Sequence, residues 1–356
     1  MRIAIDAREL QGHATGVGTY LSSILHEWAT LPAATEHDVI LCTPDAGGGG
    51  TWWEQRVLPR LVRDAKADVL FSPGYTAPVF AGVPTVVAIH DVSFAAHPEW
   101  FGWREGLRRR TLTRLAARRA ARVLTISEFS KREITTHLGI PPDKIEVIYL
   151  AAADRTPSTA AQTSAARAFS ARDNLILFAG SLFNRRHIPE LIDGFARLAR
   201  TMPDARLDIV GDNRTIPRID IEALVAASGV GDRIALRSYL PEPELAALYA
   251  RARAFVFLSE YEGFGLTPLE ALSAGLPIVV LETPVAREVY GTAALYVERP
   301  DPALIESALR RVLTDAGERA RILEAGRDIL ARYSWRRCAE RVLLTLISCS
   351  RCRGSR

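Results

Sequence analysis

The sequence predicts an α/β protein built from two doubly wound domains, each a parallel β-sheet with helices on both faces. At 356 residues the chain is longer than one average hydrophobic core supports. Short apolar runs alternate with longer amphipathic stretches, and many runs are apolar throughout, as expected of parallel strands covered on both faces. A single Ala-, Ser- and Thr-rich stretch at residues 152–174 separates two such series of similar size.

The predicted elements follow one another as repeated βαβ units. The expected strands are IAIDA, DVILCT, DVLFS, TVVAIH, RVLTIS and IEVIYL, followed by LILFAG, LDIVG, RIALRSY, AFVFLSE and PIVVLE. Helices are expected over residues 18–31, 100–121, 128–138, 189–201, 219–227 and 242–251. The expected domains are residues 1–165 and 170–333, facing each other across a cleft. Ligands of such folds bind at the carboxyl ends of the strands.

Composition and charge argue against several classes of protein. The formal net charge is only +4, and the lysines are few, so the many arginines indicate coding bias rather than a nucleic-acid-binding surface. Four cysteines form no disulfide framework in a chain of this size, which favours a reducing compartment. Charged residues interrupt the N-terminus and the apolar runs are short, so neither a signal peptide nor a membrane span is expected. We therefore expect a cytoplasmic protein.

The stretch EYEGFGLTPLEALSAG contains a predicted helix start. Thr267 has the chemistry of an N-cap, Pro268 suits the first helical position, and Glu270 would complete a capping box. This structural role accounts for Glu270 without a ligand, and at this point a binding role is equally well supported.

Glu262 precedes this predicted helix and has no place in the capping box. It follows the apolar strand AFVFLSE and stands directly before Gly263, Phe264 and Gly265. The two glycines allow backbone to approach a ligand closely, and free N–H groups at a helix start attract oxyanions. A carboxylate beside such a turn suits a ligand that carries both hydroxyls and phosphates, as a nucleotide sugar does.

At these residues the sequence resembles a known family. EGFGLTPLEALSAGLPIVV is similar to the Glu-x7-Glu signature of retaining nucleotide-sugar glycosyltransferases with the GT-B fold, family 4 (group 1). The resemblance covers nearly the whole chain and includes TGVGTY, IHD, TISEFSKREI, GSLFNRRHIPELIDGFARL, PEPELAALYARARAFVFLSE and GTAALYVERPD. It implies transfer of a hexose, of mannose or glucose type, from a nucleotide diphosphate sugar to an acceptor hydroxyl in the assembly of cell-surface glycans or glycolipids. It also implies that no metal or other cofactor is needed, and that residues 334–356 form a helix crossing back to the first domain, followed by a basic tail.

The resemblance assigns roles to residues of the second domain. Glu262 would accept hydrogen bonds from hydroxyls of the donor sugar, beside the amides of Gly263–Gly265, and Glu270 would bind the ribose. Arg185 and Arg186 match a basic pair whose second member contacts the diphosphate, which favours Arg186. A fixed cation there would stabilise the charge that develops on the leaving group. Leu240 matches the position where backbone groups touch the base, and Ser181 stands where relatives carry a further basic residue.

In the first domain the resemblance points to two segments. Gly16-Val17-Gly18 would lie near the transferred phosphate and the acceptor; as a lone GxG it is weak support for dinucleotide binding. His90 ends the strand TVVAIH, and the family places a histidine there against the donor sugar. The neighbouring Asp91 would either orient this imidazole or cap a turn.

Residues 104–122 contain eight arginines and only one acid, Glu105. All but Arg109 and Arg110 fall within roughly 140° of a helical wheel. An amphipathic surface helix explains this pattern. The alternative is an electrostatic dock on anionic lipid at the inner face of the plasma membrane, because many related enzymes use lipid-linked acceptors.

Two rival functions remain open on sequence alone. A GT-B epimerase or phosphorylase would act on related donors, and a non-catalytic glycan- or nucleotide-binding partner would share the fold. The presence of Glu262, His90 and Arg186 favours the transferase.

Overall fold

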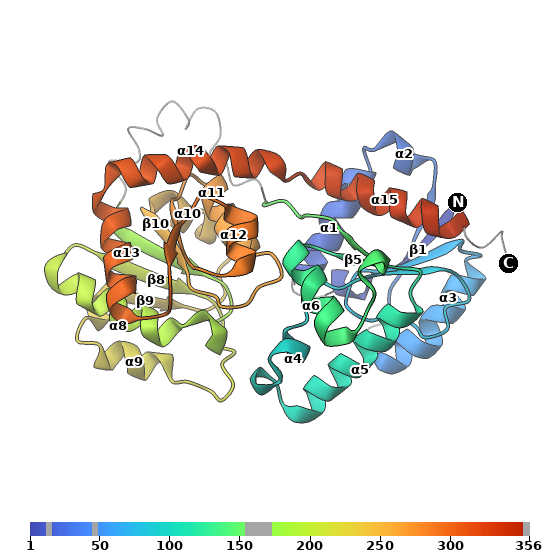
Figure 1. Cartoon of the computed structure of the whole chain (residues 1–356), viewed down its shortest axis with the longest axis horizontal. Coiled ribbons are helices and arrows are strands. Elements are labelled where there is room, and N and C mark those ends of the chain that lie inside the picture. Colours follow the sequence, from blue (N-terminus) through green and yellow to red (C-terminus); the bar gives the residue numbers. More distant parts are fainter. Residues whose placement is uncertain (12–15, 45–48, 154–172, 352–356) are drawn as a thin grey trace. The chain divides into compact units, whose positions relative to one another are not determined.

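The computed structural model describes residues 1–11, 16–44, 49–153 and 173–351. The chain divides into two compact units, of which the first comprises Met1–Leu150 with Tyr333–Arg356 and the second Ala151–Arg332. The expected boundary between domains falls within residues 154–172, outside the described residues. The two units are described separately below, and Figure 1 gives their elements.

The first unit is built on a six-stranded parallel sheet with the order β2-β1-β3-β4-β5-β6. Its strands are β1 (Arg2–Asp6), β2 (Asp38–Cys42), β3 (Val69–Ser72), β4 (Thr85–Ala88), β5 (Arg122–Thr125) and β6 (Ile145–Val147). Its longer helices are α1 (Gly16–Trp28), α3 (Leu58–Asp64), α5 (Trp103–Arg119), α6 (Glu128–Leu138) and α15 (Trp335–Arg351), and α2 (Pro32–Thr35) and α4 (Ser93–Ala96) are single turns. All six strands expected in this half of the sequence are present.

Helix α15 packs on α1 within the first unit, although the two helices lie near opposite ends of the sequence (Figure 1). The indole N–H of Trp28 donates to the carbonyl of Ala339 at 2.9 Å, and the hydroxyl of Thr345 donates to Glu146 at 2.8 Å. The buried face of α15 includes Val342 and Leu346, so this helix completes the core of the unit.

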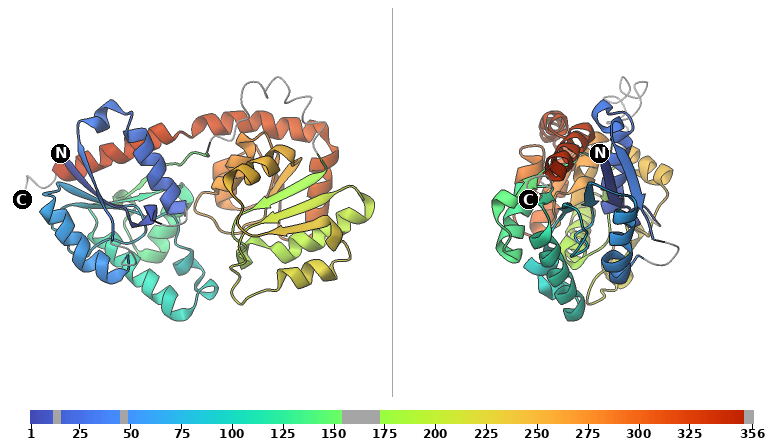
Figure 2. Two further views of the ribbon diagram at one scale, coloured as in Figure 1. Left: turned by 180° about the vertical axis from the view of Figure 1, so that it is seen from behind. Right: turned by 90° about the vertical axis from the view of Figure 1, so that its right-hand side faces the viewer.

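The second unit is a six-stranded parallel sheet with the order β12-β11-β10-β7-β8-β9. Its strands are β7 (Leu175–Ala179), β8 (Arg206–Val210), β9 (Ile234–Arg237), β10 (Ala254–Phe257), β11 (Ile278–Leu281) and β12 (Leu295–Val297). Its helices are α8 (Ile188–Thr201), α9 (Ile221–Ala227), α10 (Glu242–Arg251), α11 (Leu266–Ser273), α12 (Pro284–Tyr290), α13 (Pro302–Thr314) and α14 (Ala316–Arg332). Helices cover both faces of this sheet (Figure 2).

The predicted α/β class with two doubly wound parallel sheets is confirmed. Strand β12 was not predicted, because three residues are too few to show a period. Helix α13 packs closely on α8, where a Cβ on Gly194 would lie 2.6 Å from a methyl group of Ile305. The absence of a side chain at Gly194 therefore allows the two helices to approach.

Candidate functional site

The topology of the second sheet places two loops side by side at its carboxyl edge. Strands β7 and β10 are neighbours, and from them the chain winds outward in opposite directions, through β8 and β9 on one side and β11 and β12 on the other. Loops that leave a sheet at such a reversal diverge, and ligands of doubly wound folds bind there. The two loops are GSLFNRRH after β7 and LSEYEGFG after β10. Both segments contain residues that the sequence predicts to bind the donor.

Arg186 and Glu262 meet across these loops. Nε and Nη2 of Arg186 donate to Oε1 of Glu262 at 3.1 and 2.8 Å, and the hydroxyl of Ser259 donates to the same oxygen at 2.9 Å. Nη1 of Arg186 donates to the carbonyl of Ser181 at 2.8 Å. Within the described part of the chain, the contacts of Glu262 thus converge on one carboxylate oxygen, and Arg186 uses three of its five N–H groups.

The Arg186 side chain packs against two aromatic rings and a glycine. Its guanidinium lies over the rings of Phe257 and Phe183, at 4.7 and 5.4 Å from their centroids. Beneath it is Gly180, whose φ is +140° and whose Cβ, if present, would lie 2.7 Å from Nη1. A glycine at this position is therefore required by the placement of Arg186. Aromatic faces attract the cation and hold its orientation.

The predicted capping box at Thr267 is wrong. Helix α11 begins at Leu266, and its N-cap is Gly265, with φ +89°, ψ 65° and no side-chain capping bond. The hydroxyl of Tyr290 donates to the Gly265 carbonyl at 2.8 Å, and a Cβ at Gly265 would lie 2.0 Å from that hydroxyl oxygen. Because glycine enters the left-handed region without strain, the helix starts earlier than the Thr-Pro pair suggests. The cap therefore does not account for Glu270, which lies half-buried on α11.

The other predicted residues of this unit are dispersed around the same edge. Arg185 stacks on Phe183 at 4.4 Å, and its carbonyl accepts the N–H of Glu260 at 3.0 Å. Gly263 and Phe264 are buried in the loop after β10. Leu240 is half-buried between β9 and α10, directly before the residue that caps α10.

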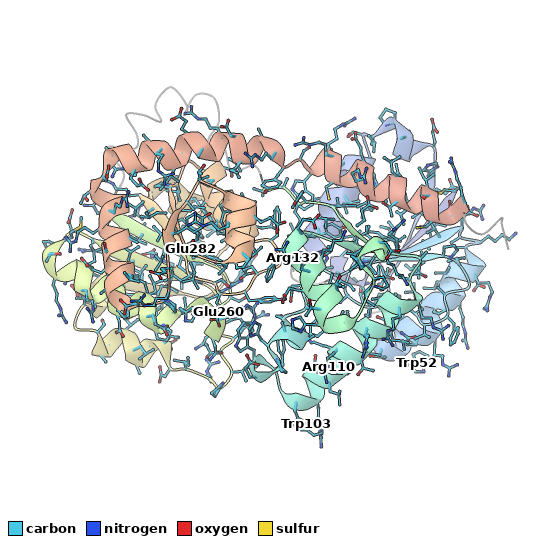
Figure 3. All side chains as sticks on the ribbon, viewed as in Figure 1. Trp52, Trp103, Arg110, Arg132, Glu260 and Glu282 are labelled. Atoms are coloured by element: carbon cyan, nitrogen blue, oxygen red, sulfur yellow. The ribbon has the colours of Figure 1, made fainter. Side chains whose placement is uncertain are left out.

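His187 was missed by the sequence reasoning, although it directly follows the arginine pair. It bonds Glu260, which Figure 3 labels on the loop after β10. Ser259 was also missed, because a serine at a strand end has many uses and only its contact with Glu262 reveals this one.

In the first unit, His90 lies buried just beyond the end of β4. Its Nε2 lies 2.8 Å from the Pro73 carbonyl, which can only accept, so this nitrogen carries the proton. The edge of the ring meets Tyr20 at 4.8 Å between centroids. Burial lowers the pKa of His90, so the imidazole is neutral near pH 7. Asp91 caps a turn: it accepts the N–H and hydroxyl of Ser93 at 2.9 and 2.7 Å.

Gly16 and Gly18 form the first turn of α1, where Gly16 is exposed and Gly18 is buried. The four residues that precede them, 12–15, lie outside the described residues. Nearby, at the end of β1, Arg8 pairs with two buried acids, Asp6 and Glu54. Burial raises the pKa of Asp6 against the opposing effect of Arg8. This cluster was not predicted, because Glu54 is remote in the sequence.

The described residues contain no group of three or more His, Cys, Asp or Glu side chains able to hold a metal ion. Among the helices that the structure describes, none has both the length and the apolar character needed to cross a membrane.

Two family models match the chain. The model of glycosyltransferase family 4 covers residues 15–152, and that of glycosyl transferases group 1 covers residues 161–329. The chain belongs to the family 4, group 1 glycosyltransferases. The resemblance seen in the sequence is therefore confirmed, and the protein is an enzyme.

Relatives of this glycosyltransferase include several mannosyltransferases. O-antigen chain mannosyltransferase B of Escherichia coli is 27% identical over 79% of this chain and 74% of its own length. The MMP alpha-(1->4)-mannosyltransferase of Mycolicibacterium hassiacum is 29% identical over 72% of this chain and 64% of its own length.

Solved structures confirm the GT-B fold of this glycosyltransferase. HepE of Anabaena in complex with UDP-glucose aligns with a TM-score of 0.74 at 18% identity, over 98% of this chain and all of its own. WaaG, a glycosyltransferase involved in lipopolysaccharide biosynthesis, aligns with a TM-score of 0.72 at 18% identity, over 97% of this chain and 99% of its own.

Proposed function

We propose that this enzyme transfers a hexose, with retention at the anomeric carbon, from a nucleotide diphosphate sugar to an acceptor hydroxyl in glycan assembly. The observation that carries the proposal is the Arg186–Glu262 pair at the strand reversal of the second sheet, beside the start of α11. A fixed cation, a carboxylate with one uncommitted oxygen and a helix N-terminus match the diphosphate and the sugar hydroxyls of such a donor.

The remaining hydrogen-bonding capacity of the pair suggests the role of each residue. Arg186 has two N–H groups left for the diphosphate, and Oε2 of Glu262 is left for a sugar hydroxyl. The amides of Gly263–Gly265 would lie at the sugar and phosphate, and Glu270 would hold the ribose. Arg185 and Leu240 would contribute to the diphosphate and base ends of the same donor.

The proposed chemistry is displacement on the front face of the sugar. The leaving diphosphate oxygen takes the proton of the acceptor hydroxyl as the new glycosidic bond forms and the bond to phosphate breaks. Arg186 and the N–H groups at the start of α11 stabilise the negative charge on the departing diphosphate. We propose that these groups meet that charge without a metal ion, and that activity survives a chelator.

A mannose-type donor is favoured over a glucose-type donor by the names of the relatives described above. In the first unit, neutral His90 leaves Nδ1 as an acceptor for a donor-sugar hydroxyl. Gly16 and Gly18 would lie near the donor phosphate and the acceptor, a glycan or a lipid-linked sugar.

The side chains on helix α5 favour a further proposal, that the enzyme contacts anionic membrane peripherally at the cytoplasmic face. Arg110, Arg114 and Arg118 stand one turn apart along a groove of about 420 Å³, and no acid in the described residues pairs with them. Trp103 and Leu107 on the same helix are 73% and 50% exposed, and Trp103 and Arg110 point away from the sheet (Figure 3). Cationic residues beside exposed apolar groups suit an anionic lipid surface.

The test combines a donor screen with product analysis. GDP-, UDP- and ADP-hexoses are ranked by thermal shift, because ligand at 100 times its dissociation constant stabilises a protein by about 2.7 kcal/mol. The best donor is then incubated with and without acceptor sugars, and proton NMR reports the anomeric configuration of any product. Retained configuration in an acceptor-dependent product supports the proposal. Sugar conversion without acceptor would indicate an epimerase, phosphate-dependent cleavage a phosphorylase, and binding without turnover a non-catalytic partner.

A further inference from the structure

His187 has a backbone conformation that is uncommon for residues other than glycine. It stands between Arg186 and the start of α8, with φ +50° and ψ 45° in the left-handed region. Histidine has a Cβ, so this conformation costs free energy that glycine would avoid. A strained residue directly beside the proposed diphosphate-binding arginine calls for a physical reason.

Both ring nitrogens of His187 face carboxylates. Nε2 lies 3.3 Å from Oε2 of Glu260, and Nδ1 lies 3.6 Å from Oε1 of Glu190, while the side chain is only 14% exposed. Burial lowers the pKa of His187, but the bonds and charges of Glu190 and Glu260 outweigh burial and raise it to about 9. The imidazole is therefore a cation near pH 7, with one acid beside each ring nitrogen.

Helix stability does not explain this cation. His187 is the N-cap residue of the 14-residue helix α8, where the helix dipole is positive and disfavours a positive charge. Asparagine, glycine or an acid would stabilise this helix start better. The two glutamates offset the unfavourable placement of a positive charge at this helix start. A residue with a purely structural role would not need that compensation.

The contacts of His187 instead join two segments of the site. Glu190 lies in the first turn of α8, and Glu260 lies in the loop that carries Glu262. The backbone of the same two segments is joined where the N–H of Glu260 donates to the carbonyl of Arg185 at 3.0 Å. His187 thus links the turn that bears Arg186 to the loop that bears Glu262, next to their own ion pair.

We propose that His187 is a positioning residue, whose cationic ring holds the Arg186 turn against the Glu262 loop so that the pair presents its remaining groups to the donor. This inference rests on the proposed function for its catalytic consequence. The charged groups that face or adjoin the ring are Glu190 on α8, Glu260 on the loop after β10, and Arg185 and Arg186 on the preceding turn. When the imidazole loses its proton, one ring N–H and the attraction of the positive charge to both acids are lost, so the hold of the turn on the loop weakens.

The test uses variants that keep the backbone and change the charge. His187→Asn tolerates the left-handed conformation but is neutral, and His187→Lys keeps a cation with a higher pKa. The control is His137→Gln on α6, which also removes an imidazole lying beside a glutamate, Glu133, at 3.5 Å. Each enzyme is assayed for kcat and KM with the preferred donor from pH 6 to 10.5.

For the wild type we expect kcat/KM to fall as the pH rises through about 9. His187→Asn should have kcat/KM lower by about tenfold at pH 7, because small displacements of a reacting group are costly, and should lack this alkaline limb. His187→Lys should move the limb upward, and His137→Gln should behave as wild type. An alkaline limb retained in His187→Asn, with unchanged kcat/KM, would overturn the proposal.

A measurement without turnover separates this proposal from the proposed function. The NMR resonance of the Arg186 Nε–H, assigned by its loss in Arg186→Lys, should shift in His187→Asn and with pH through about 9, but not in His137→Gln. A shifted resonance in an enzyme that transfers no sugar would retain the positioning role and reject the function. An unmoved resonance would reject the positioning role, whatever the activity.

Discussion

Arg186 and Glu262 form an ion pair of 2.8 Å although 76 positions separate them in the sequence. The guanidinium and the carboxylate are 11% and 20% exposed, so each is held by the other in a largely dry setting. The phosphate-binding and sugar-binding groups proposed from the resemblance are thus one unit. A substitution at either residue will be felt at the other, and the predictions below allow for that coupling.

The first prediction concerns Arg186→Ala. We expect nucleoside diphosphate binding to weaken by about 1.5–3 kcal/mol, as for the loss of a charged hydrogen bond, with a matching decrease in kcat. Titration calorimetry measures the affinity. Arg185→Ala is the matched comparison and should weaken diphosphate binding less than Arg186→Ala does, because Arg185 stacks on Phe183 and makes no ion pair with Glu262 in the described structure. Equal affinity in Arg186→Ala and wild type would remove Arg186 from the diphosphate site.

The second prediction separates Glu262 from Glu270. Glu262→Gln should lower turnover with the full sugar donor far more than it lowers affinity for the bare nucleoside diphosphate, which lacks the sugar and feels Glu262 only through Arg186. Glu270→Gln should weaken binding of the bare nucleotide, because an amide is a poorer partner for two ribose hydroxyls than a carboxylate. If both variants bind the diphosphate and turn over as wild type does, the two glutamates are structural.

The Glu262→Gln and Glu270→Gln variants should also differ in their free energy of unfolding. Glu262→Gln leaves Arg186 without its counter-ion, so the free energy of unfolding should fall by about 1–3 kcal/mol. Glu270→Gln should cost less, since Gly265 and not Thr267 caps α11 and no capping box is broken. Urea denaturation of the two variants measures the difference, and a more stable Glu262→Gln enzyme would contradict the ion-pair argument.

The third prediction concerns the start of α11. Gly265→Ala should lower the free energy of unfolding by about 1–3 kcal/mol, because the left-handed backbone and the Tyr290 hydroxyl both oppose a Cβ there. Gly229 also has a positive φ, +74°, but a Cβ added there would have no atom within 4 Å. Gly229→Ala therefore measures the cost of the left-handed backbone alone. Adding Tyr290→Phe to Gly265→Ala should recover part of the loss. Equal costs for the two glycine variants would show that the steric contact is unimportant.

The fourth prediction concerns the groove along α5. Sedimentation with liposomes should increase with the fraction of anionic lipid and decrease steeply with salt. Replacing Arg110, Arg114 and Arg118 together by Gln should abolish this binding while leaving transfer to a soluble acceptor unchanged. The control changes the same charge on exposed residues of the other unit: Arg197, Arg200 and Arg327 to Gln. Weak sedimentation that is equal for neutral and anionic vesicles would leave α5 an ordinary surface helix.

The sequence by itself determined the fold class and eleven of the twelve strands that the structure describes. Runs such as LILFA and AFVF are apolar at every position because both faces of a parallel sheet are covered, and this local pattern is visible without the structure. The Glu-x7-Glu segment and the paired arginines could also be identified from the sequence, because each is a short continuous stretch.

Only the tertiary structure decided how these stretches act together. The order of the second sheet makes β7 and β10 neighbours, and this adjacency brings Arg186 to Glu262, Ser259 to the same carboxylate and His187 to Glu260. It also decided that α11 begins at Gly265, because the hydroxyl of Tyr290, 25 positions away, fixes that turn. Hydrogen bonds and ion pairs form between groups that are close in space. The spacing of residue types along the sequence therefore predicts helices and strands, whereas the packing of the sheet decides which side chains form a site.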